Sequence, residues 1–98
     1  MLVDWMGPFH KGREWLQRDE AMRSIGMASQ TIMLAAKAIG YDLCPMIGFD
    51  FDKVAELIGL PDDHVIGNLI AIGKATKPAW PKPGQLSLDE VVAWDRFE

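Results

Sequence analysis

The segment from about Asp19 to Ile39 constrains the fold most, because it is long and has apolar residues on more than one side of a helix. One set of residues follows the i, i+3, i+7 spacing of a buried helical face: Ile25, Ala28, Ile32, Ala35 and Ile39. Further apolar residues spread onto other faces: Met22, Met27, Met33 and Leu34. We therefore predict a long helix that is covered on more than one side, and Gly40 is suited to the left-handed position that ends many helices.

The connection that follows, GYDLCPMIGFD at residues 40–50, combines apolar side chains with two glycines and a proline. Loops usually run over the surface and are polar. This composition indicates either that a flat apolar group lies against the segment or that neighbouring elements bury it.

A second helix is predicted over Phe51–Ile58, with Asp50 as its N-cap and an inner face of Val54, Leu57 and Ile58. The run VIGNLIAIG at residues 65–73 is continuous, apolar and β-branched, which is typical of a strand covered on both faces. Residues 75–98 form a proline-rich, extended tail. A short helix is expected near its end, where Ser87 and Glu90 fit a capping box. Residues 1–18, broken by Gly7, Pro8 and Gly12, are predicted to be an irregular arm.

The chain has 98 residues, of which 49% are hydrophobic, and a net charge of −4. The length favours a single unit, and the apolar load is heavy for so small a domain, so an oligomer or a missing partner segment would explain it. The absence of a basic patch argues against nucleic acid as a partner. One cysteine fits a reducing compartment, and no apolar run approaches the ~20 residues of a membrane span. With no signal peptide either, we expect a soluble, cytoplasmic protein without a membrane partner.

No catalytic or metal-binding constellation can be found in the sequence. The run GNLIAIGKAT differs from a phosphate-binding loop, because Gly67 and Gly73 are one residue too far apart and Ala75 replaces the Ser or Thr. His10 and His64 are isolated, and Cys44 fits a half-buried hydrophobic residue better than a nucleophile. The carboxylate pairs at residues 62–63 and 89–90 fit turn and capping positions.

The order of the segments nevertheless resembles a known family. A helix ending AAKAIGYD is followed by CPMIGFD, then KVAELIGLP, VIGNLIAIGK and finally SLDEVV after the proline-rich stretch. This order resembles the C-terminal half of the nitroreductase family, which comprises FMN-dependent NAD(P)H oxidoreductases. The resemblance implies an α+β, nitroreductase-like half-domain with a long central helix, a short helix, a buried strand and an extended C-terminal tail. Residues 1–98 would then be a single partial domain.

The resemblance also implies where the flavin would lie. In that family the Pro-x-x-Gly segment passes beside the flavin ring and directs backbone N–H groups at N5 and O4. Carried over, Pro45, Met46, Ile47 and Gly48 would bind FMN, and hydride would pass from NAD(P)H to a nitroaromatic, a quinone or a similar acceptor. The protein would orient the cofactor, which itself carries the chemistry, so no catalytic side chain is assigned.

Two departures from the family pattern stand out. Some relatives have a glutamate where this chain has Ile47. Members also place Lys or Arg just before the terminal segment to bind the FMN phosphate. Lys82 is the closest basic residue here, so the resemblance implies that Lys82 binds this phosphate. The family's N-terminal half has no counterpart in the sequence. The resemblance implies an intertwined homodimer, or assembly with a chain that supplies this half.

Two other readings of the residues stay open. The chain could be a non-catalytic dimerisation module that pairs through the small residues Gly26, Ala28 and Ser29. It could also be a protein that binds another small ligand on the apolar segment at residues 40–50.

Overall fold

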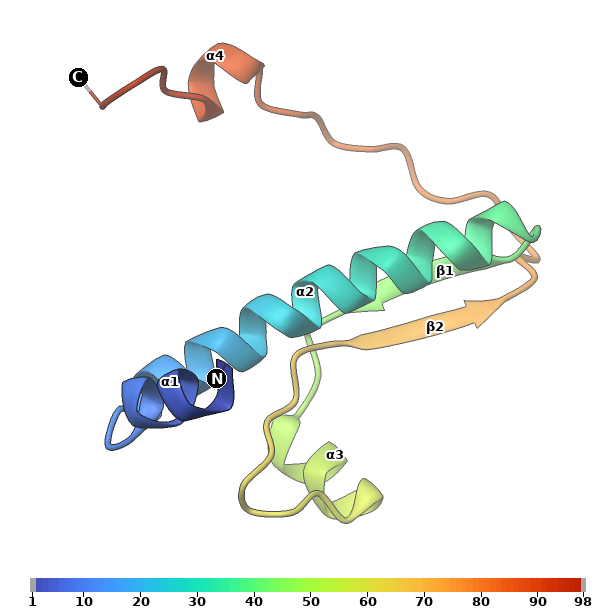
Figure 1. Cartoon of the computed structure of the whole chain (residues 1–98). Coiled ribbons are helices and arrows are strands. Elements are labelled where there is room, and N and C mark those ends of the chain that lie inside the picture. The colour runs from blue at the N-terminus through green and yellow to red at the C-terminus, as the bar shows by residue number, and fades with distance from the viewer. Residues whose placement is uncertain (1, 98) are drawn as a thin grey trace.

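A computed structural model describes residues 2–97 of the chain (Figure 1). The chain forms helices and two strands, and the two strands pair in one sheet. Their bounds are α1 at Leu2–His10, α2 at Glu14–Ala38, β1 at Asp42–Met46, α3 at Phe51–Ile58, β2 at Leu69–Gly73 and α4 at Leu88–Val91.

The strands β1 and β2 form an antiparallel pair in which Asp42 lies opposite Gly73 and Met46 lies opposite Leu69. Helix α2 packs along β1, and α1 packs on the first part of α2. Because the strands are antiparallel, the two connections leave from opposite ends of the pair. The segment after Met46 leads to α3, while the C-terminal tail leaves from the Gly73 end (Figure 1).

The inner face of α2 differs from the predicted stripe. The residues that are buried or half-buried along this face are Met22, Ile25, Ser29, Met33 and Ala36. Of the predicted stripe, Ile25 lies on this inner face, whereas Ile32 and Ile39 are 48% and 73% exposed. Helix α2 thus has a second apolar side that its own chain leaves uncovered, and coverage of this helix on more than one side stays a prediction.

Small and polar residues fix how closely the segment before β2 approaches α2. A Cβ placed on Gly67 would lie only 2.2 Å from Cγ2 of Ile25, so the backbone at Gly67 approaches the helix where a side chain could not fit. One residue further, the hydroxyl of Ser29 donates a hydrogen bond of 3.2 Å to Oδ1 of Asn68. Ser29, one of the small residues considered for pairing two helices, therefore contacts Asn68 of its own chain instead.

Several local predictions are confirmed. Helix α3 has the predicted bounds, and Oδ1 of Asp50 accepts a hydrogen bond of 3.1 Å from the Lys53 amide as its N-cap. Gly40 has a φ of 89°, in the left-handed region. The capping box of α4 is present, since Glu90 accepts from both the amide and the hydroxyl of Ser87. Between β2 and α4 the tail is extended.

Other predictions were wrong. The N-terminal arm is helical, because α1 forms despite Pro8, and α2 begins at Glu14. Residues 42–46, read as part of a loop, form β1. The later strand is limited to Leu69–Gly73 and is mostly exposed in the single chain rather than covered on both faces. In α3 the half-buried residues are Val54 and Ala55, whereas Leu57 and Ile58 are exposed.

The described chain has very little core. Only Ala36 and Ser29 among the described residues are buried, with 8% and 7% of their surface exposed. The radius of gyration is 18.0 Å, whereas a compact domain of this length has one of about 13 Å. Large apolar side chains remain exposed on every element. These properties are those of one part of a larger packed unit.

Candidate functional site

The predicted cofactor-binding segment, residues 45–48, lies where β1 turns toward α3. Pro45 and Met46 are the last residues of β1, and Ile47 and Gly48 begin the connection. All four residues are exposed, and Ile47 has 69% of its surface accessible. The structure therefore keeps these four residues together on one continuous, accessible segment, here called the platform.

The backbone of the platform is free to meet another molecule. A Cβ placed on Gly48 would have no atom within 4 Å, so nothing inside this chain requires glycine at that position. Within the described residues, the amides of Ile47 and Gly48 donate no hydrogen bond to another backbone group. Unpaired N–H groups on an apolar surface suit a flat ring that carries polar atoms on its edge.

An open cavity of about 450 Å³ begins beside the platform. Its apolar lining comes from α2, the platform, α3 and the segment before β2, and includes Met22, Ile47, Phe51, Ala55 and Ile66. Arg18, Asp52 and His64 also line it. Ile47 is thus shared between the platform and this cavity, and the apolar lining could keep water away from a group bound at the platform.

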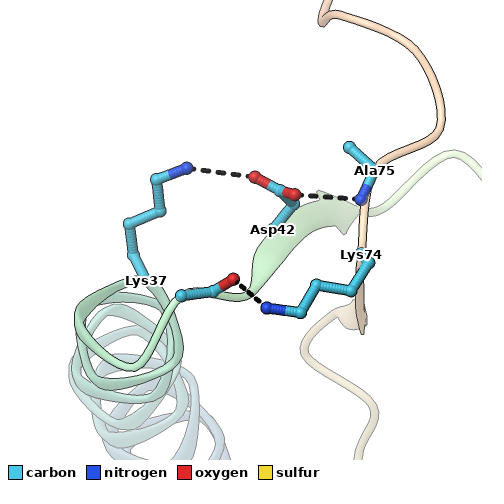
Figure 2. Close-up of polar contacts among 5 residues, drawn as sticks. Lys37, Asp42, Lys74 and Ala75 are labelled. Carbon is cyan, nitrogen blue, oxygen red and sulfur yellow. Dashed lines mark hydrogen bonds and ion pairs between the residues drawn. The ribbon is translucent and has the colours of Figure 1, made fainter.

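A polar cluster at the opposite end of the strand pair fixes the start of the tail (Figure 2). One oxygen of Asp42 lies 3.0 Å from Nζ of Lys37, and the other accepts a hydrogen bond of 2.9 Å from the amide of Ala75. Lys74 donates a hydrogen bond of 2.6 Å to the carbonyl of Gly40. We call these five residues the Asp42 clamp. The Lys74 ammonium also lies 4.6 Å from the ring centre of Tyr41, a favourable cation–π geometry.

The clamp has a clear electrostatic signature. The hydrogen bond from the Ala75 amide, together with the Lys37 ammonium, lowers the pKa of the Asp42 carboxyl below its ordinary value of 3.8. The carboxylate is therefore the form that holds the clamp together.

Lys82, the predicted phosphate ligand, is not brought to the platform within this chain. It lies in the extended tail and donates a hydrogen bond to Oε1 of Gln85. The tail leaves from the Gly73 end of the strand pair, whereas the platform follows Met46 at the other end. A single chain therefore presents these two parts of the predicted site separately.

The remaining candidates have local roles. Nδ1 of His10 lies 2.8 Å from the carbonyl of Met6, and His64 pairs with Asp63 at 2.7 Å, which lowers the pKa of the Asp63 carboxyl. The side chain of Cys44 is exposed rather than half-buried. Within residues 2–97 there is no cluster of three or more potential ligands for a metal ion. In the same range, no helix combines the length and the hydropathy that crossing a membrane requires.

The clamp was not predicted from the sequence. In the sequence, the clamp corresponds only to a short GYD motif after a helix, at residues 40–42, and to a lysine after a strand, at residue 74. Neither is informative until the pairing of β1 with β2 brings these positions together.

Comparison with known proteins gives a consistent result. The model of the nitroreductase family matches residues 8–74. Protein DrgA of Synechocystis sp. is 55% identical over 96 residues, which cover 93% of this chain and 46% of DrgA. MhqN of Bacillus subtilis, whose name assigns it provisionally to the NAD(P)H nitroreductases, is 33% identical over 95 residues, covering 96% of this chain and 46% of MhqN.

Solved structures agree with these sequence matches. A crystal structure of a protein from Exiguobacterium sibiricum, assigned to the nitroreductases and in complex with FMN, superimposes with a TM-score of 0.83 at 28% identity. The match covers 97% of this chain and 45% of that one. YdfN of Bacillus subtilis gives the same TM-score at 31% identity, covering 94% of this chain and 45% of its own. The chain thus spans less than half the length of these relatives, and the predicted α+β half-domain is confirmed.

Proposed function

Since the chain belongs to the nitroreductase family, we propose that it forms part of an FMN-dependent NAD(P)H oxidoreductase in which the platform lies against the flavin. The exposed backbone at Ile47 and Gly48 is the observation that carries this proposal. Its amides have no backbone partner in the described chain, and Gly48 leaves open the space that a side chain would fill.

The residues of the platform would orient and shield the cofactor. The Ile47 and Gly48 amides would donate hydrogen bonds to polar atoms on the edge of the ring, and Met46 and Ile47 would exclude water from it. Bound FMN would accept hydride from NADH or NADPH and pass reducing equivalents to a nitroaromatic, a quinone or a similar acceptor. This division of labour agrees with the absence of an acid, a base or a nucleophile at the platform.

The rest of the binding site would come from a second chain. Lys82 would bind the FMN phosphate, and the separation of the tail from the platform suits a lysine that serves a site on another subunit. The uncovered apolar side of α2 supports either a homodimer or assembly with a chain that supplies the other half of the domain. We place this assembly in the cytoplasm.

An absorbance spectrum of the purified protein tests the proposal first. It is recorded before and after incubation with excess FMN followed by desalting. Retained flavin bands would support the proposal and justify an assay of NAD(P)H oxidation. A protein that stays colourless while it still self-associates would favour the non-catalytic helical module instead.

A pair of glycine variants tests the platform itself. Gly48→Val should reduce FMN affinity at least about tenfold, the effect of losing roughly 1.4 kcal/mol of binding free energy. Gly7→Val is the matched control, because a Cβ at Gly7 also has no atom within 4 Å but lies on α1, away from the platform. Titration of flavin fluorescence measures both affinities. Unchanged affinity in Gly48→Val would show that the platform is wrongly assigned.

A further inference from the structure

Within residues 2–97, the C-terminal segment beyond the clamp takes no part in the main packing contacts between helices and strands. Every residue from 76 to 97 is exposed, and the element contacts of the described chain join β1 with β2, α2 with β1, and α1 with α2. The hydrogen bonds within this segment are local, such as those between Ser87 and Glu90. In the part of the chain that the structure describes, the Asp42 clamp therefore holds the last hydrogen bonds between the tail and the body of the chain.

Two consecutive tail residues are held at this point, and by different partners. Ala75 is held through its amide by Asp42, and Lys74 is held through its ammonium by the Gly40 carbonyl. Asp42 is itself tied to the end of α2 by Lys37. The direction in which the backbone leaves Ala75 is thus set relative to both α2 and β1, as Figure 2 shows.

The composition of the tail allows this direction to be transmitted. Pro78, Pro81 and Pro83 favour an extended, semi-rigid backbone. The segment from Ala75 to Trp80 spans up to about 16 Å at roughly 3.3 Å per residue, so a rotation of about 20° at Ala75 moves its end by about 6 Å.

We propose that Asp42 is a positioning residue, which aims the C-terminal tail through its hydrogen bond to the Ala75 amide. The hydrogen bond to Ala75 fixes the direction in which the tail leaves the strand pair, and the ion pair with Lys37 holds the Asp42 carboxylate in place. The consequence for phosphate binding by Lys82 rests on the proposed function, whereas the aiming of the tail does not.

Distances between paired spin labels test this proposal in the full chain. Labels are placed at Gln30→Cys on α2 and Trp80→Cys in the tail, in a Cys44→Ser background and diluted with unlabelled chain so that distances within one molecule dominate. Both labelled residues are exposed. With Asp42 present we expect a narrow distance distribution, and in Asp42→Ala we expect it to widen or shift by several ångströms.

Three further variants separate the contributions. Asp42→Asn keeps an oxygen that can accept from Ala75, and Lys37→Met removes only the ion pair, so both should stay close to the parent distribution. Glu20→Gln removes a charge from another pair on α2, the 2.6 Å contact with Arg23, and is the matched control. Labels at Gln30→Cys and Ile72→Cys should report an unchanged distance in Asp42→Ala, which shows that the strand pair is intact.

Two results would overturn the proposal. One is a parent-like distribution in Asp42→Ala, because the tail would then be aimed without Asp42. The other is equal widening in Asp42→Asn and Lys37→Met, which would assign the aim to the ion pair rather than to the hydrogen bond. The distances are measured without flavin. The result therefore does not depend on whether the chain binds FMN, and the two proposals can fail separately.

Discussion

Replacing Gly67 with alanine should destabilise the packing of α2 against the strand pair. The new methyl group would lie 2.2 Å from Cγ2, 3.0 Å from Cδ1 and 3.1 Å from Cβ of Ile25. A rotation of the Ile25 side chain could move the first two atoms away, but the Cβ is fixed by the helix backbone, and χ1 of a β-branched residue in a helix is restricted. The segment before β2 must therefore move away from α2.

The loss of unfolding free energy can be bounded from the typical effect of adding a methyl group to a packed site. Inserting a methyl group into a packed site typically costs about 1–3 kcal/mol of unfolding free energy. A shift of the backbone would also strain the neighbouring hydrogen bond between Ser29 and Asn68, which is 3.2 Å long. We therefore expect Gly67→Ala to cost about 2 kcal/mol, near the middle of that range.

Urea unfolding followed by circular dichroism, at one fixed concentration of the chain, measures this cost. Gly48→Ala is the control, because a Cβ there meets no atom within 4 Å. A double-mutant cycle with Ile25→Ala sharpens the test. Removing Cγ2 and Cδ1 leaves only the Cβ contact, so the double variant should be more stable than the sum of the single effects predicts. Wild-type stability in Gly67→Ala, or strict additivity in the cycle, would refute the explanation.

Two further predictions concern polar contacts. Ser29→Ala leaves Oδ1 of Asn68 without its hydrogen bond in a half-buried position, and should cost about 1 kcal/mol of unfolding free energy. Ser24 is exposed, so Ser24→Ala should cost little. Equal stability of the two variants would contradict this prediction. The folded-state pKa of Asp42 is lowered, so the stabilising effect of its carboxylate is complete above its ordinary value of 3.8 and is lost as the pH falls through the lower, folded-state pKa. Hydrogen exchange at the Ala75 amide should accelerate, relative to unbonded amides, over this acidic range; constant relative protection would argue against the bond.

The parts of the fold that the sequence predicted well depend on local signals. Asp50 and Gly59 define the ends of α3 through a side-chain cap and a φ of 64°, and neither requires information from distant residues. The same holds for Ser87 and Glu90 at α4. A capping pattern can be recognised from sequence because its two partners lie within one turn of each other.

The inner face of α2 could not be chosen in the same way. Apolar residues occur on several sides of this helix, and the stripe predicted as buried ran from Ile25 to Ile39. The structure instead buries the side centred on Ser29, a polar residue that is hydrogen-bonded to Asn68, 39 positions away. A hydrophobic pattern alone argues against a serine at the centre of the buried face.

Strand β1 was missed for a related reason. Pro45 and the nearby glycines are typical of a loop, and only pairing with β2 shows that residues 42–46 are extended. The same pairing creates the Asp42 clamp. For the site, the platform at residues 45–48 was predicted from family resemblance, and its contact with flavin stays a prediction.

The uncovered apolar side of α2 has a thermodynamic consequence. Its exposed residues include Met27, Ile32, Leu34 and Ile39, while the chain buries almost nothing of its own. Most of the free energy that holds these elements in place must then come from association with other polypeptide surface. Where that surface belongs to a separate chain, the midpoint of unfolding is not a fixed property, because it rises with the concentration of that chain.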